Sequence, residues 1–95
     1  MNEACAFEII TRQITDDTWI VGGVVFKTIK LFDTLTIIAE GDNKAIAFFV
    51  QDIMMYGHHL EEIERGSAGQ LYLCGSEGRL LSQAKYLYKL ESNPE

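Results

Sequence analysis

Residues 19–26, WIVGGVVF, are apolar or glycine at every position. In an extended strand neighbouring side chains point to opposite sides of the sheet, so this stretch predicts a strand with two apolar faces. One side would carry Trp19, Val21 and Val25, and the other Ile20, Val24 and Phe26. A small antiparallel sheet usually leaves one face in water, so the second apolar face predicts cover from a helix, a ligand or another chain.

The adjacent glycines Gly22 and Gly23 interrupt this strand. Glycine inside a strand weakens packing and is typical of a bulge, a bend or the close approach of another backbone. A local adjustment of the strand is therefore the preferred interpretation, ahead of a ligand contact.

Two further strands are predicted on either side of this one. Residues 4–14 alternate between the two faces of a half-buried strand, and Asp16-Asp17 offers a turn before residues 18–28. Residues 35–40 form the third run. Three consecutive strands predict an antiparallel meander.

The sequence then changes period, and we expect an amphipathic helix that is capped by Asp42 and ends near Tyr56 before Gly57. Its core stripe, at i, i+3, i+4, i+7 and i+8, would be Ile46, Phe49, Val50, Ile53 and Met54. Ala45, Phe48 and Met55 widen this stripe beyond what one sheet face covers. They are a second indication of a surface that another molecule buries.

The last third of the chain predicts a hairpin and a helix. Residues 60–65 and 70–74 would pair around the loop 66–69, and Ser76 would cap a final helix. Its apolar stripe would be Leu80, Leu81, Ala84, Leu87 and Tyr88, with residues 91–95 as a frayed tail. The predicted fold is a single α+β domain spanning residues 1–95, a mainly antiparallel five-stranded sheet in the order β-β-β-α-β-β-α, with both helices on one face.

Composition narrows the functional classes. The chain has 95 residues, 47% of them hydrophobic, which is enough for one folded domain. Fourteen acidic against eight basic side chains give a net charge of −6, which disfavours nucleic-acid binding. The first residues lack a signal-peptide pattern, so we expect a cytoplasmic protein, with Cys5 and Cys74 as reduced thiols. No cofactor or metal site is predicted.

His58, His59 and Glu61 are the only cluster of titratable groups suited to binding a ligand or moving protons. Adjacent residues in an extended segment point in opposite directions, so the two histidines are poorly placed to hold one metal ion. His59 and Glu61 would share a face. Surface and capping roles are the simpler interpretation.

Three functional hypotheses follow, and the sequence does not decide whether the chain is an enzyme. The first is a non-catalytic interaction or regulatory module that acts as a homodimer. Its interface would comprise Trp19, Val21 and Val25, or Phe48 and Met55. The second is a small-molecule-binding protein or enzyme with an apolar pocket near His58, His59 and Glu61. The third is an acidic decoy that occupies the site of a nucleic-acid-binding partner.

Overall fold

A computed structural model describes residues 3–15, 18–39, 44–75 and 78–90. The described chain is built almost entirely of strands. They are β1 (Glu3–Ile14), β2 (Trp19–Val25), β3 (Ile29–Lys30), β4 (Thr34–Ala39), β5 (Lys44–Met55), β6 (His58–Leu60), β7 (Glu62–Ile63), β8 (Ala68–Cys74) and β9 (Tyr86–Leu90), with a 3₁₀ helix η1 (Gly78–Ser82) between β8 and β9. Within these residues no helix is long and apolar enough to cross a bilayer.

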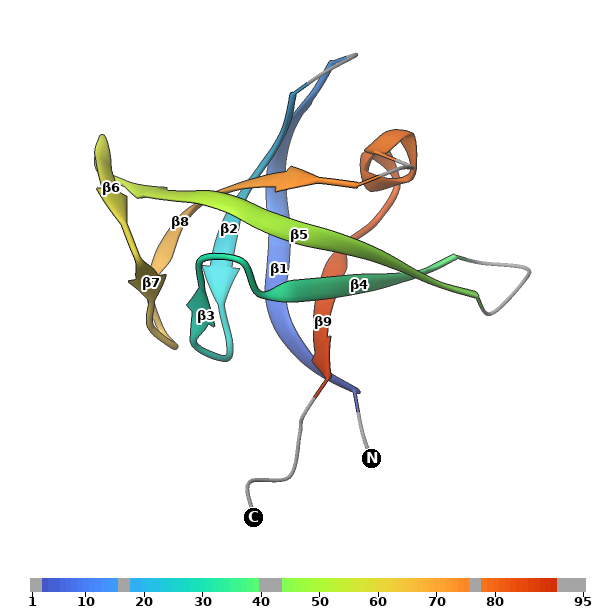
Figure 1. The fold of residues 1–95 in the computed structure, drawn as a ribbon, viewed down its shortest axis with the longest axis horizontal. Coiled ribbons are helices and arrows are strands. Elements are labelled where there is room, and N and C mark those ends of the chain that lie inside the picture. Colours follow the sequence, from blue (N-terminus) through green and yellow to red (C-terminus); the bar gives the residue numbers. More distant parts are fainter. Residues whose placement is uncertain (1–2, 16–17, 40–43, 76–77, 91–95) are drawn as a thin grey trace.

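Six of these strands close into an antiparallel barrel in the order β1, β2, β8, β5, β4 and β9, with β9 returning to β1 (Figure 1). β6 folds back and pairs antiparallel with the last three residues of β5, and β3 pairs with β7 in a separate two-stranded ribbon. η1 lies at one end of the barrel, where it connects β8 to β9. The predicted α+β fold with two helices is therefore wrong.

The first predicted helix is strand β5. A bulge between Val50 and Asp52 shifts the strand by one residue, so that Ile46, Val50 and Ile53 all face inward at a spacing that imitates a helix. β-branched and aromatic residues, which favour strands, dominate this stretch. The alternation between buried Ile46, Phe48 and Val50 and exposed Ala45, Ala47 and Phe49 was the better guide.

The second predicted helix is also wrong, since this segment forms only the short 3₁₀ helix η1 and then strand β9. η1 ends at Ser82, and β9 begins at Tyr86. The predicted hairpin fails because β7 pairs with β3, while β8 pairs with β2 and β5. The meander ends after β1 and β2, since β4 pairs with β5 and β9. The predicted turns at 16–17 and 41–42, the cap at Ser76 and the tail 91–95 lie outside the described residues.

The barrel interior is the hydrophobic core. Its fully buried side chains come from all six barrel strands, from the β3–β7 ribbon and from η1, and each stabilises the fold by about 1.5–3 kcal/mol relative to an exposed side chain. The largest are Phe7, Phe48, Ile29, Leu35, Ile53, Ile63, Leu71, Leu81 and Leu87. At the η1 end, the rings of Trp19 and Phe48 meet edge to face with centroids 6.1 Å apart. Gly78 packs so closely on the Trp19 ring that a Cβ there would lie 1.9 Å from it.

β2 has the two faces that its sequence predicts. Val21 and Val25 are fully buried inside the barrel, while Val24 is half-buried and Phe26 is exposed on the outside. Of the three possibilities that the paired glycines left open, the structure shows the close approach of another backbone at Gly23, where a Cβ would lie 1.8 Å from the carbonyl oxygen of Glu8. β1 carries a bulge at this point, between Ile9 and Thr11.

Candidate functional site

The seam between β4 and β9 is the least connected junction of the barrel. β1 and β2 pair at seven positions, whereas β4 and β9 pair only at Thr36 and Tyr88. The Thr36 hydroxyl reinforces this contact by donating to the Tyr88 carbonyl at 3.4 Å. Figure 1 shows the two strands crossing here and then diverging, β4 toward one side and the start of β9 toward η1.

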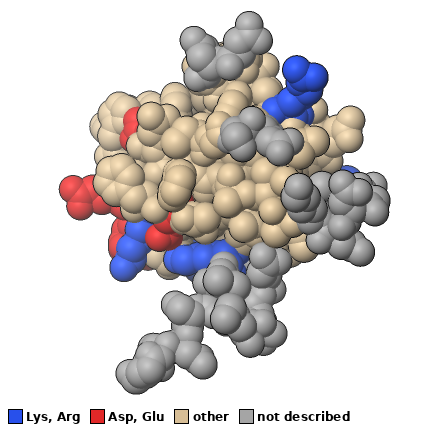
Figure 2. All heavy atoms as spheres, turned by 45° about the vertical axis from the view of Figure 1, so that its right-hand side comes forward, with Lys and Arg blue, Asp and Glu red and all other residues tan. Residues whose placement is uncertain are grey.

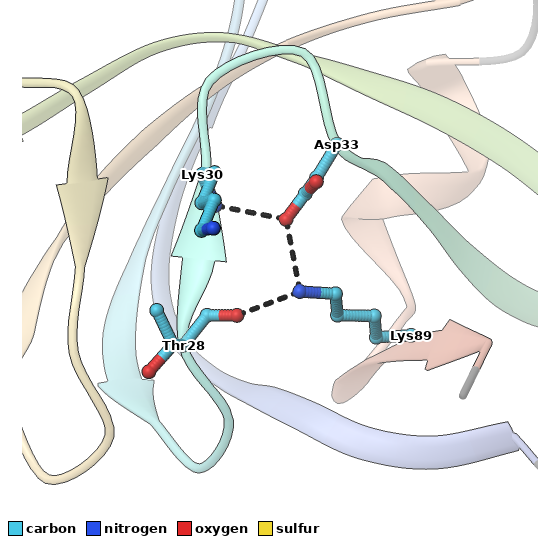
Figure 3. Close-up of polar contacts among 4 residues, drawn as sticks. All are labelled: Thr28, Lys30, Asp33 and Lys89. Carbon is cyan, nitrogen blue, oxygen red and sulfur yellow. Dashed lines mark hydrogen bonds and ion pairs between the residues drawn. The ribbon is translucent and has the colours of Figure 1, made fainter. Parts of the chain in front are cut away.

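An ion pair closes one end of the seam. The Lys89 Nζ donates to Asp33 Oδ2 at 3.0 Å and to the Thr28 carbonyl at 2.8 Å, which ties β9 to the segment around β3 (Figure 3). The backbone N–H of Lys30 donates to the same Asp33 oxygen at 2.8 Å. This carboxylate therefore holds the turn between β3 and β4 in place as well as the end of β9.

The opposite end of the seam opens into a hollow of about 430 Å³. Its lining comes from the end of β4, from η1 and from the start of β9, namely Ile37, Ile38, Leu80, Gln83, Ala84, Lys85, Tyr86 and Tyr88. Arg12 supports the wall formed by η1 and the residues that follow it. Its guanidinium donates to the carbonyls of Ser82 at 3.0 Å and Ala84 at 2.8 Å. The volume lies in the range of ligand-binding pockets, and Lys85 is the single charged residue in the lining.

The outer surface around the seam carries no charge at the positions that alternate outward along β4, along β5 as far as Phe49, and along β9. We call this the uncharged face, and it comprises Thr34, Thr36, Ile38, Ala45, Ala47, Phe49, Tyr86 and Tyr88. Three large side chains are well exposed: Ile38 at 46%, Phe49 at 54% and Tyr86 at 39%. Figure 2 shows a broad area on this side of the described molecule without Lys, Arg, Asp or Glu, and charges at its edges.

The histidine cluster lies elsewhere, on the β5–β6 hairpin. His59 Nδ1 is 2.8 Å from Asp52 Oδ2, so the partner of this histidine is a residue of β5 rather than Glu61. His58 and Glu61 are exposed, and none of the three predicted residues lines the hollow. In the described ranges, no group of three His, Cys, Asp or Glu side chains could hold a metal ion.

The residues expected at a dimer interface are mostly inside the barrel. Val21, Val25 and Phe48 are fully buried, so they offer no surface to a second chain. Trp19 and Met55 are half-buried and pack against the core. The exposed large apolar side chains lie elsewhere, at Ile38, Phe49 and Tyr86 on β4, β5 and β9, and at Ile10, Phe26, Phe32 and Tyr56.

The acidic residues of the described chain lie in different surroundings, and their positions do not test the decoy hypothesis. Glu61, Glu62 and Glu64 are exposed near β6 and β7, while Asp33 is paired with Lys89. The acidic residues at positions 16, 17, 40 and 42 lie outside the described residues.

Sequence reasoning missed the hollow because its walls come from residues 37–38 and 80–88, which the fold alone brings together. One local signal was available. Tyr86, Leu87 and Tyr88 alternate in the strand period, with Leu87 fully buried and the two tyrosines outside.

Comparison with protein-family models, curated proteins and solved structures found no match to this chain. The site is therefore interpreted from its own geometry.

Proposed function

We propose that this chain is a non-catalytic interaction module that binds a segment of another protein on the uncharged face. The observation that carries the proposal is the exposure of Ile38, Phe49 and Tyr86 on a surface without charges, in a chain with a net charge of −6. Protein interface cores are depleted in charged residues and enriched in aromatic ones. A contiguous exposed apolar surface is a usual mark of an interaction site.

A different chain fits this face better than a second copy. A two-fold contact centred on the hollow would set one hollow against the other and Lys85 against Lys85. The homodimer is the alternative. It would need a contact centred near Phe49, where two acidic copies could meet without opposing like charges. We also propose a cytoplasmic setting, in which Cys5 and Cys74 remain free thiols.

The test compares Phe49→Lys on the uncharged face with Gln13→Lys, which adds the same charge to an exposed position of β1. Partners captured by the wild-type chain are purified and their dissociation constants are measured by calorimetry. We expect Phe49→Lys to weaken binding at least about tenfold, as for an interface hot spot, and Gln13→Lys to leave it unchanged. Equal binding by both variants would refute the proposal.

Light scattering over a wide range of protein concentration identifies the occupant. A monomer is the expected result for a module whose partner is a different protein. A dimer that Phe49→Lys dissociates and Gln13→Lys does not would overturn the foreign partner and make a second copy the occupant of the face.

A further inference from the structure

The backbone of β4 alternates between its two neighbours. Val50 N–H donates to the Asp33 carbonyl at 2.9 Å, so this carbonyl, directly before β4, points toward β5. In an antiparallel ladder successive residues of a strand direct their backbone groups to opposite sides. The backbone N–H and C=O groups of Leu35 and Ile37 therefore also point toward β5. Those of Thr36 and Ile38 point toward β9.

The backbone of β9 alternates between β1 and β4 in the same way. Ile9 N–H donates to the Lys85 carbonyl at 2.8 Å, so the backbone of Lys85 faces β1, and that of Tyr86 faces β4. Because Thr36 pairs with Tyr88, the next rung of an antiparallel ladder would join Ile38 to Tyr86. The described strands make no such pair, and both residues line the hollow instead.

We propose that the hollow receives an extended segment of the partner protein, which hydrogen-bonds to the backbone of Ile38 and Tyr86 at the missing rung. This inference rests on the proposed function and specifies the partner's conformation. Addition of a strand to free backbone groups is a common mode of peptide recognition, with main-chain bonds supplying affinity and side-chain pockets supplying specificity.

The lining defines the chemistry of that segment. Leu80, Ala84 and the tyrosine rings offer apolar contact, so a side chain of the segment that enters the hollow should be aliphatic or aromatic. Lys85, the single charge in the lining, favours a carboxylate on the segment beside it. An acidic and otherwise apolar extended peptide is therefore the expected occupant.

The experiment selects binders from a phage-displayed library of random octapeptides against the full chain, and the selected peptides are then synthesised. We expect sequences with alternating apolar residues and at least one acidic residue. On binding, backbone amide exchange measured by NMR should slow at Ile38 and Tyr86. Replacing the acidic residue of the peptide by lysine should weaken binding up to about fivefold, the size of an exposed ion pair.

Charge reversal at the rim provides the matched control. Lys85→Glu should remove the preference for the acidic peptide, whereas Arg65→Glu, at an exposed site in the turn before β8, should keep it. Selection of no peptide, or of peptides whose affinity Lys85→Glu does not change, would overturn the inference. Peptides that lose affinity with Phe49→Lys but leave Ile38 and Tyr86 unprotected would refute the strand at the missing rung and preserve the proposed function.

Discussion

The two sides of the barrel are built differently. On one side β1, β2, β8 and β5 form long ladders, and at Gly23 the backbones approach so closely that a methyl group has no space. On the other side β4 and β9 meet at one residue pair and are held further by the ion pair of Lys89 with Asp33. Binding surfaces are often drawn from the less stable part of a fold, and we expect that part here to be the side of β4 and β9, which contains the hollow and adjoins the uncharged face.

Gly23→Ala should have the largest effect on stability, because the added Cβ would lie 1.8 Å from the Glu8 carbonyl oxygen, a backbone atom that cannot move alone. We expect the free energy of unfolding in urea to fall by about 3 kcal/mol or more.

Gly22→Ala is the matched control for this substitution. A Cβ at Gly22 would meet the Thr11 Oγ1 at 2.6 Å, and a side-chain atom can rotate away. The expected loss is below about 1 kcal/mol, offset in part by the lower entropy of the unfolded chain. Equal losses for the two variants would contradict the tight ladder at Gly23.

Lys89→Met should have an intermediate effect, because it removes the ion pair to Asp33 and the hydrogen bond to the Thr28 carbonyl. Both charged side chains are partly exposed, so we expect a loss of about 1–2 kcal/mol in urea unfolding. Amide exchange should quicken at Tyr88 and stay unchanged at Val21.

The control is Lys85→Met, at the rim of the hollow, which should change the stability by less than about 0.5 kcal/mol. A loss as large for Lys85→Met as for Lys89→Met would show that the ion pair does not close the seam.

Arg12→Met should have a smaller effect. The variant frees the carbonyls of Ser82 and Ala84, which support the wall of the hollow. These groups are exposed and water replaces the lost donors, so we expect a loss of about 0.5–1 kcal/mol. Arg79→Met serves as the control on η1 itself. A larger loss of stability for Arg79→Met than for Arg12→Met would show that the hydrogen bonds of Arg12 do not support this wall.

The smallest expected effect concerns Cys5, which pairs with Tyr88 in the ladder of β1 and β9. Burial raises the pKa of the Cys5 thiol above its ordinary value of 9.0, and the nearby Glu8 carboxylate adds to the rise. A raised pKa in the folded state favours the neutral thiol, so this contribution to stability is complete below that ordinary value and is lost as the pH rises through the folded pKa.

Unfolding of the wild-type chain and of Cys5→Ala, measured under reducing conditions from about pH 7 to about pH 10, isolates this contribution. The wild-type chain should lose slightly more stability than Cys5→Ala over that interval. A steeper loss in Cys5→Ala would contradict the assigned direction of the shift.

The strands of this barrel could be read from the sequence where the apolar pattern is regular. β1, β2 and β4 were predicted close to their observed bounds, and β8 contains the whole of the predicted run 70–74. Phe7 and Ile9 of β1, Val21 and Val25 of β2, and Leu35 and Ile37 of β4 all keep the expected spacing of two between buried residues or a multiple of it, although β1 also carries bulges.

The same reasoning failed where the strand period is broken or the contact is remote. The bulge in β5 made a strand resemble a helix, and the pairing of Thr36 with Tyr88 joins residues that no local pattern relates. The hollow depends on this remote pairing, so its residues could not be found from spacing. The histidine cluster was conspicuous in the sequence but lies away from the hollow.

Backbone amide exchange of the free chain by NMR tests the open end of the seam most directly. Ile38 and Tyr86 face the hollow, whereas Val21 and Leu71 pair across β2 and β8. We predict that the amides of Ile38 and Tyr86 exchange at least about a hundredfold faster than those of Val21 and Leu71. Comparable protection at all four residues would show that the ladder between β4 and β9 is complete, which would contradict the missing rung.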